Sequence, residues 1–435
     1  MTADHKPPRT ALLIVFLVVV IDLLGFGIVL PLLPLFGRDY VQHLVTTPLA
    51  IGAITGLLMA VFSLMQFVFA PLWGRISDRI GRRPVLLIGL AGSVFFYALF
   101  GYASQMGSTQ AALALLLLFA ARIGAGVSGA TISTAQAVIA DCTPPEARKS
   151  GMALIGAAFG IGFTLGPLVG FAALSLFPGT LSVVGYAASL ISAVSLVLGL
   201  VLLPETRDFR NAPPLDRRWF QFGTFRETIV NPAIGPVMLT FFLATLGFAS
   251  FEVTLAQLNK DALQLVERHN LLIFAYVGMV LMLTQGLIYR RLAKKVTEVT
   301  FMFIGILCMG GGVLALGGVT YAAVTQMLSF QGLLTLQLLA LTLAVVGFAF
   351  LTPSAQALIS RRSDPARQGE ILGVNQSISA MARILGPILG LSLYSATDTH
   401  LLPYLFGGGL LLLMLPLIPY IRRGGNETIT SGPSS

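Results

Sequence analysis

Four charged residues interrupt long apolar runs of this sequence: Asp22, Arg122, Glu252 and Arg383. A carboxylate in apolar surroundings can take up and release a proton as its environment changes, and a guanidinium can pair with it or with an anionic solute. Asp22 and Glu252 are therefore alternative candidates for a proton acceptor, with the two arginines as their partners. Structural ion pairing, which only holds helices together, is the competing interpretation for all four.

Other polar side chains in the apolar runs could bind a solute or could equally bond one helix to another. They are Gln66, Gln136, Gln285, Gln356, Asn375 and Gln376. The four histidines lie in the tail or in outer connections, so we expect solvated rings and no buried proton shuttle. No Ser/His/Asp constellation is apparent, and Cys142 and Cys308 are too few and too far apart for a disulfide framework or a thiolate metal site. The sequence therefore predicts no cofactor and no enzyme.

The elements that position these residues are predicted to be membrane-spanning helices. Of the 435 residues, 56% are apolar and only 10% are charged, against about 25% charged residues in a soluble domain. At about 20 apolar residues per membrane helix, the sequence divides into twelve spans, at 11–36, 50–72, 85–104, 111–140, 151–176, 181–203, 233–258, 270–289, 299–318, 333–359, 370–395 and 401–421. The first run is too long for a signal peptide, so we expect it to be retained. The predicted fold is an all-α membrane protein.

Basic residues alternate from one connection to the next. With the N-terminus in the cytoplasm, 22 of the 27 Lys and Arg residues fall in inner segments, and only Arg38, Lys260 and Arg268 lie in outer loops. The positive-inside rule therefore predicts that both termini are cytoplasmic. The net charge of +9 then reflects topology and does not indicate a nucleic acid partner. Short loops favour a bacterial cytoplasmic (inner) membrane.

Two halves of the chain repeat. A shift of 220 residues places Gln136 on Gln356 and Gly166-Pro167 on Gly386-Pro387. We therefore predict an N-terminal six-helix bundle at 1–204, a cytoplasmic linker at 205–231, and a C-terminal six-helix bundle with a short tail at 232–435. Chance similarity between apolar helices is the alternative, but a polar Gln and a Gly-Pro pair in register argue against it.

The connection after the second predicted span carries the most specific pattern. It reads Gly74-Arg-Ile-Ser-Asp78-Arg79-Ile-Gly81-Arg82-Arg83. The two glycines would permit close helix approach and a tight turn, and Asp78 could accept bonds from an arginine or a helix N-terminus. The arginines would face anionic headgroups. The stretch resembles the G-x-x-x-D-R-x-G-R-R signature of the major facilitator superfamily, in which it acts as a gating motif and two six-span halves enclose a substrate site near the midplane.

Further stretches resemble the twelve-span drug/proton antiporters. The run from Asp22 to Pro34 is similar to their L-G-x5-P-x-x-P pattern, and Arg122-x3-Gly126 matches R-x-x-x-G. The predicted fifth span carries Gly162, Gly166, Pro167 and Gly170, which resemble G-x3-G-P-x2-G-G except that Phe171 replaces the last glycine. Glycines at this spacing also suit ordinary helix packing in membranes. The stretch from Gly369 to Pro387 is similar to the entrance of span eleven in tetracycline-type exporters.

This resemblance implies proton-driven export of a small amphipathic compound by a monomer, with a small-molecule substrate, protons and membrane lipid as partners. Typical tetracycline exporters carry a His in span eight and an Asp in span nine, whereas 270–289 contains no His and 299–318 no acid. The substrate is therefore left open. The second-half counterpart of the motif, Arg290-Arg-Leu-Ala-Lys294-Lys295, also lacks the acid and both glycines.

Other classes of membrane protein fit the sequence less well. An ATP-driven pump would need G-x-x-x-x-G-K-[ST], but no Gly is followed by Lys. A channel would need a selectivity filter or charged rings, and neither is apparent. The main alternative is a facilitator or proton symporter for metabolite uptake. A transceptor or a membrane enzyme fits the sequence less well than either kind of transporter.

Overall fold

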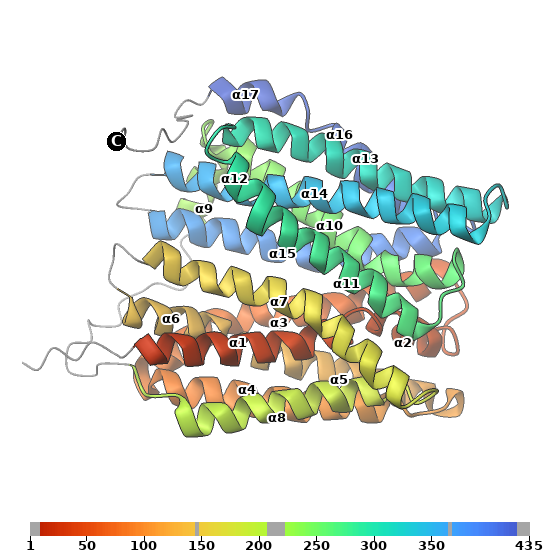
Figure 1. Ribbon diagram of the computed structural model, residues 1–435, viewed down its shortest axis with the longest axis horizontal. Coiled ribbons are helices and arrows are strands. Elements are labelled where there is room, and N and C mark those ends of the chain that lie inside the picture. Colours follow the sequence, from red (N-terminus) through yellow and green to blue (C-terminus); the bar gives the residue numbers. More distant parts are fainter. Residues whose placement is uncertain (1–8, 144–147, 207–221, 364–367, 424–435) are drawn as a thin grey trace, which may run out of the picture. The chain divides into compact units, whose positions relative to one another are not determined.

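The computed structural model describes residues 9–143, 148–206, 222–363 and 368–423 (Figure 1). Every long element in these ranges is a helix. Twelve helical segments are long and apolar enough to cross a membrane: Leu12–Val41, Pro48–Ile80, Arg82–Ala103, Ser108–Cys142, Ala157–Leu176, Val183–Leu202, Gly235–Asp261, Glu267–Leu292, Glu298–Val324, Phe330–Arg362, Ile371–Ser395 and Leu402–Arg423. The predicted all-α fold with twelve spans is confirmed.

Several spans consist of more than one helix. The first half of the chain contains α1 (Arg9–Val29), α2 (Leu33–Val41), α3 (Pro48–Ile80), α4 (Arg82–Ala103), η1 (Ser108–Gln110), α5 (Ala111–Gly129), α6 (Ile132–Cys142), α7 (Arg148–Leu176) and α8 (Val183–Leu202). The second half contains α9 (Phe222–Val230), α10 (Gly235–Asp261), α11 (Glu267–Leu283), the π-helical η3 (Thr284–Tyr289), α12 (Arg290–Leu292), α13 (Glu298–Val324), α14 (Phe330–Arg362), α15 (Gln368–Ser395), α16 (Leu402–Leu412) and α17 (Leu417–Arg423).

The first span breaks between α1 and α2, around Pro31. A proline has no backbone N–H to continue the helical bonds, so neighbouring carbonyls need other partners. Asn270, a buried residue of α11, donates its side-chain amide to the Pro31 carbonyl at 3.0 Å. Such side-chain donors are how membrane helices tolerate a break.

Contacts divide the chain into two units. One comprises Met1–Leu44, Val61–Trp219 and Glu267–Gly278, and the other comprises Val45–Ala60, Phe220–Val266 and Met279–Ser435. The six-helix division at 204 and 232 concerns the sequence repeat and stays a prediction. Much of the predicted linker lies outside the described residues.

Both Gly-Pro helices pack closely within their own unit. A Cβ atom built on Gly166 of α7 would lie 2.8 Å from the Cα atom of Gly27 on α1. A Cβ atom built on Gly386 of α15 would lie 2.8 Å from the Cβ atom of Ala249 on α10. In each half, therefore, the Gly-Pro helix and the first long helix approach at a distance that only small residues allow.

The residues of the Gly74–Arg83 motif lie in helices rather than in a loop. α3 continues to Ile80, eight residues beyond the expected end of the second span at 72, and α4 begins at Arg82. Gly81 alone separates them, with φ at +107°. The expected end was too early because the apolar stretch ends before the helix does.

Candidate transport site and inner-loop network

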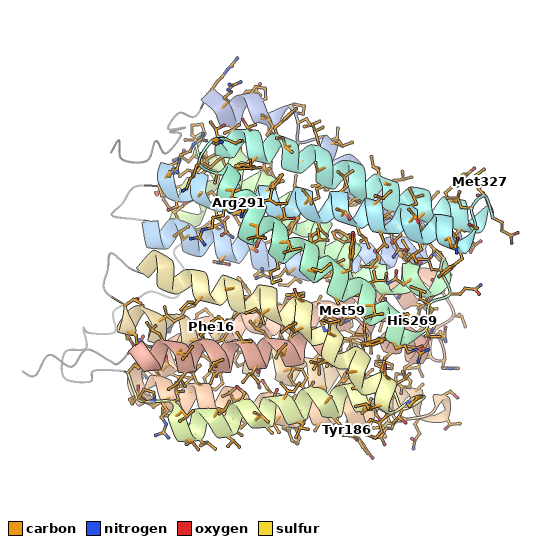
Figure 2. The ribbon with its side chains drawn as sticks, in the orientation of Figure 1. Phe16, Met59, Tyr186, His269, Arg291 and Met327 are labelled. Atoms are coloured by element: carbon orange, nitrogen blue, oxygen red, sulfur yellow. The ribbon has the colours of Figure 1, made fainter. Side chains whose placement is uncertain are left out.

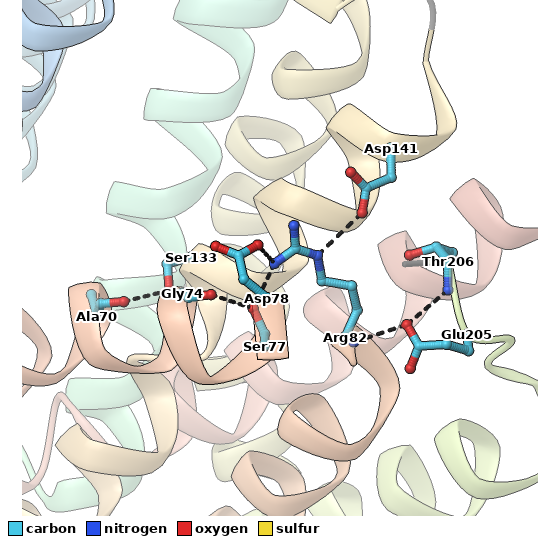
Figure 3. A network of polar contacts seen from close by, with 9 residues as sticks. All are labelled: Ala70, Gly74, Ser77, Asp78, Arg82, Ser133, Asp141, Glu205 and Thr206. Carbon is cyan, nitrogen blue, oxygen red and sulfur yellow. Dashed lines mark hydrogen bonds and ion pairs between the residues drawn. The ribbon is translucent and has the colours of Figure 1, made fainter. Parts of the chain in front are cut away.

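The Arg82 guanidinium is the centre of a charge network at the start of α4 (Figure 3). Its Nη1 atom lies 2.8 Å from Oδ1 of Asp78 and donates to Oγ of Ser77 at 2.7 Å. Its Nε atom donates to Oδ2 of Asp141 at 3.1 Å. Arg82 is only 5% exposed. One buried cation thus joins the ends of α3, α4 and α6, and removing it would take a counter-charge from each of two partly buried acids.

Glu205 completes this network from the end of the sixth span. Its carboxylate accepts the backbone N–H groups of Arg82 at 2.9 Å and Arg83 at 3.1 Å, so it caps the positive N-terminus of α4. A Cβ atom at Gly81 would lie 2.3 Å from Oε2 of Glu205, and φ at that residue is +107°. Only glycine therefore fits the turn that brings the carboxylate to the helix. The Arg83 side chain donates to the Leu200 carbonyl at 2.7 Å.

Two expectations for the motif need correction. Arg82 is buried and bound by protein groups, so it does not face headgroups, whereas Arg79 is exposed and Arg83 is half-buried. Gly74 does not lie at a close helix contact, since a Cβ atom there would meet nothing within 4 Å among the described residues. The sequence did not reveal Asp141 or Glu205 as partners, although acids beside an arginine-rich connection were a usable signal.

Arg122 lies in α5, where it is 2% exposed. Its Cζ atom is 4.4 Å from the ring centroid of Phe62 and 6.0 Å from that of Phe26. The Nε and Nη1 atoms have no hydrogen-bond partner among the described residues. The negative faces of the aromatic rings stabilise the cation in part, but two of its donors remain open.

Asp22 is half-buried in α1, and its Oδ1 atom has no hydrogen-bond partner in the described part of the chain. Ser93 of α4 lies within hydrogen-bonding reach of the carboxyl group. The residue borders a cavity of about 20 Å³ together with Thr131 and Ala135, and such a volume can hold about one water molecule. The carboxyl group thus has room for a mobile polar partner.

Asp22 and Arg122 do not form an ion pair within 4.0 Å in the described structure, although we expected them to interact directly. The buried phenol of Tyr97 lies within electrostatic range of both groups. Tyr97 was not predicted as a residue of the site, because a tyrosine in an apolar run resembles an ordinary core residue. The structure therefore brings the acid and the arginine near one tyrosine without closing the pair.

Glu252 and Arg383 form the corresponding arrangement in the second half. Glu252 is half-buried in α10, Arg383 is exposed in α15, and each lies within electrostatic range of the other. No ion pair within 4.0 Å joins them among the described residues, and Nη1 of Arg383 donates instead to Oγ of Ser379 at 2.9 Å. Because a charge in hydrocarbon is costly, an arginine within a span is expected to face a polar partner or a cavity.

Four of the candidate amides have different surroundings. Gln136 of α6 and Gln376 of α15 are exposed, and Gln356 is exposed at the position that matches Gln136 in the repeat. Asn375 is 2% exposed, and its Oδ1 atom lacks a partner among the described residues. An open acceptor in an apolar span is available to water or to a solute.

The antiporter-like residues of α7 serve helix packing in this structure. A Cβ atom on Gly162 would lie 2.7 Å from Cβ of Leu23, and one on Gly170 would lie 3.2 Å from Cδ1 of Leu271. Pro167 lies inside the helix between them. These glycines therefore allow α7 to pack closely against the part of α1 that carries Asp22.

His400 contradicts the expectation that the histidines are solvated. Its ring stacks on Tyr394 with centroids 4.2 Å apart, and Nδ1 lies 2.7 Å from the Tyr394 carbonyl oxygen. The Tyr394 hydroxyl donates to Oδ2 of Asp261 at 3.1 Å. The connection after α15 folds back over that helix, which no local sequence pattern indicates.

Twelve spans, repeated Gly-Pro helices and a motif network centred on Arg82 define a multi-pass transporter with two related halves. The sequence profile of the Major Facilitator Superfamily matches residues 15–333 and 312–433. The chain belongs to this superfamily, whose members are transporters and not enzymes.

Two groups of relatives cover nearly the whole chain. It is 31% identical to the tetracycline resistance protein, class C, of Escherichia coli over 427 residues, which are 97% of this chain and 99% of that protein. It is 29% identical to the human Major facilitator superfamily domain-containing protein 10, over 90% of this chain and 89% of that protein. The chain is therefore a secondary transporter related to the tetracycline resistance proteins and to this human protein.

Solved structures agree with the fold. The human organic anion transporter MFSD10 (TETRAN) matches with a TM-score of 0.64 at 27% identity, covering 95% of this chain and 99% of that chain. A D-xylose-proton symporter matches with a TM-score of 0.74, covering 94% of this chain and 96% of that chain. Its identity is only 17%, so it supports the fold alone.

Proposed function

We propose that this protein exports small amphipathic compounds in exchange for protons. The observation that carries the proposal is that the four mid-span charges form no ion pair within 4.0 Å in the described structure. Structural pairs would be closed, because an unpaired charge at this depth costs several kcal/mol. Open pairs are expected where an acid changes its protonation, or where a solute replaces its partner.

Asp22 is the proposed proton acceptor. Its open Oδ1 atom, the small cavity beside it and the neighbouring Tyr97 would let a proton or a water molecule reach the carboxyl group. Protonation of Asp22 would weaken its attraction to Arg122 and so change the balance between two arrangements of the helices. Glu252 with Arg383 is the second candidate for this role.

The substrate would bind to polar groups in the membrane-spanning helices. Gln136, Asn375 and Gln376 offer amide groups, and Arg383 offers an accessible cation. The names of the relatives refer to resistance to tetracycline and to transport of organic anions, which supports a small organic compound as the substrate. Export, rather than uptake, rests on the tetracycline resistance proteins and on the antiporter-like stretches of spans one and five.

The network around Arg82 would act as the gate. Its bonds join α3, α4 and α6 in this structure, and a transport cycle would have to break and remake some of them. We further propose that both termini are cytoplasmic, that the membrane is a bacterial inner membrane, and that the two six-helix halves move against each other during transport.

Accumulation of a fluorescent lipophilic dye in energised cells tests export. Cells that contain the protein should hold less dye than cells that contain the Asp22→Asn variant at equal membrane abundance. A protonophore should abolish the difference. Higher dye levels in cells with the wild-type protein would instead indicate uptake and overturn the proposal.

A further inference from the structure

Among the described residues, no acidic side chain pairs with the basic residues at the end of the eighth span. Arg290, Arg291, Lys294 and Lys295 are all exposed, and the structure records no ion pair or hydrogen bond from their side chains to a described residue. Four cations so close in sequence repel one another. We propose that they bind an external anion, the headgroup phosphate of an anionic phospholipid.

Three of these cations line one pocket of the second unit. The pocket has a volume of about 390 Å³ and is bordered by Gly286, Leu287, Arg290, Arg291 and Lys294. A Cβ atom on Gly286 would meet nothing within 4 Å, so the backbone at that residue faces open space. Figure 2 shows Arg291 at the short helix that ends this span. The pocket is therefore a hollow with cations at its rim, large enough for a phosphate group.

Helix geometry brings these cations together. Arg290 and Arg291 lie in α12 and Lys294 lies in the turn that follows it, and all three border the same pocket. The segment Thr284–Tyr289 before them is π-helical. A π-helical turn holds more residues than an α-helical one, and it therefore rotates the following cations relative to the face of α11. Such turns often lie at functional sites.

The apolar side of the pocket matches a lipid better than a soluble anion. Leu287 is 51% exposed and Ile288 is 45% exposed, immediately before the cations. The candidate span that contains them runs from Glu267 to Leu292, so the cations lie at its end, at the level of headgroups. Acyl chains would lie along the apolar residues while the phosphate meets the guanidinium and ammonium groups.

Lipid binding can be measured directly on the purified, full-length protein. Thermal unfolding would be recorded in phosphatidylcholine nanodiscs with and without phosphatidylglycerol, and bound lipid would be counted by native mass spectrometry. The pocket variant is Arg291→Gln/Lys294→Gln. The matched control is Arg422→Gln/Arg423→Gln, which removes two exposed cations from the end of α17, outside the pocket.

We expect phosphatidylglycerol to raise the Tm of the wild type and of the control, but not that of the pocket variant. Each basic residue near an anionic surface contributes about fivefold to binding, so two substitutions should weaken it roughly 25-fold. The Tm of the pocket variant in phosphatidylcholine alone should equal that of the wild type, which shows that the variant folds.

Two results would overturn the proposal. Equal loss of the lipid response in both variants would show that only overall surface charge matters. Equal stabilisation of the detergent-solubilised protein by inorganic phosphate would show a soluble-anion site instead of a lipid site. Neither result depends on transport, so the proposed export function is tested separately.

Discussion

The connections after the second span of each half differ in how their positive charge is neutralised. In the first half, Arg82 is buried and has Asp78 and Asp141 as partners, while Glu205 caps the helix that begins there. In the second half, the exposed cations Arg290 to Lys295 have no such acids among the described residues. The repeat has therefore kept the positive charge and lost the groups that neutralise it.

This difference indicates that positive charge has a separate role in each connection. Internally neutralised cations hold helices together and can change their partners during a conformational cycle. Cations without internal partners contribute little to the fold and are available to an external anion. Substitutions in the two connections should therefore have unequal effects on stability and on lipid response.

The largest effect is expected for Arg82→Ala. Loss of the guanidinium would leave Asp78 and Asp141 partly buried without it, at a cost of about 3 kcal/mol after allowance for their partial exposure. Thermal unfolding in detergent measures this, with Arg79→Ala as the control because Arg79 is exposed. Equal Tm values for the two variants would contradict a structural role for the network.

Gly81→Ala should have the second-largest effect, a loss of stability. A Cβ atom there would lie 2.3 Å from the Glu205 carboxylate at a φ of +107°, and such strain costs about 2 kcal/mol. Gly74→Ala provides the control, since its Cβ atom would enter open space inside a helix. Comparison of the two Tm values is the measurement, and an unchanged Tm for Gly81→Ala would argue against the tight turn.

Asp78→Asn should leave the protein folded and inserted, because Arg82 keeps its bonds to Asp141 and Ser77. The arrangement in which the network is closed would lose a charge-assisted contact worth about 1.5 kcal/mol. Its population would fall about tenfold, and the transport cycle would slow accordingly. Initial transport rates at equal membrane abundance provide the measurement. A wild-type transport rate in this variant would contradict the gating role of the motif.

The smallest effect is expected for Arg291→Gln/Lys294→Gln in neutral lipid. These side chains have no recorded partner among the described residues, so the free energy of unfolding should change by less than about 0.5 kcal/mol. Chemical or thermal unfolding in phosphatidylcholine would check this value. Destabilisation comparable with that of Arg82→Ala would show that the two connections do not differ as proposed.

Most of the fold could be predicted from the sequence because apolar length and the positions of basic residues determine where helices can cross a membrane. The pairing of Asp78 with Arg82 is local, four residues apart along the chain, and the motif indicated it. Asp141 and Glu205 join the network from distant spans, which no short pattern could show. His400 was assigned to solvent because its stacking on Tyr394 depends on how a connection folds back.

Contacts between spans could not be predicted from the sequence. Asp22 and Arg122 both interrupt apolar runs and were candidate partners, yet the guanidinium lies over Phe62 and the Asp22 carboxyl group borders a cavity. The rise of a helix determines height, whereas rotation and side-chain packing determine which groups meet.

The most direct test of the account is substrate movement in proteoliposomes with an imposed pH gradient, comparing the wild type, Asp22→Asn and Glu252→Gln at equal reconstitution. We predict that the wild type moves substrate against its concentration gradient, that Asp22→Asn does not, and that Asp22→Asn still binds substrate. If Asp22→Asn still drives uphill movement while Glu252→Gln does not, the proton acceptor lies in α10 and the assignment to Asp22 is contradicted.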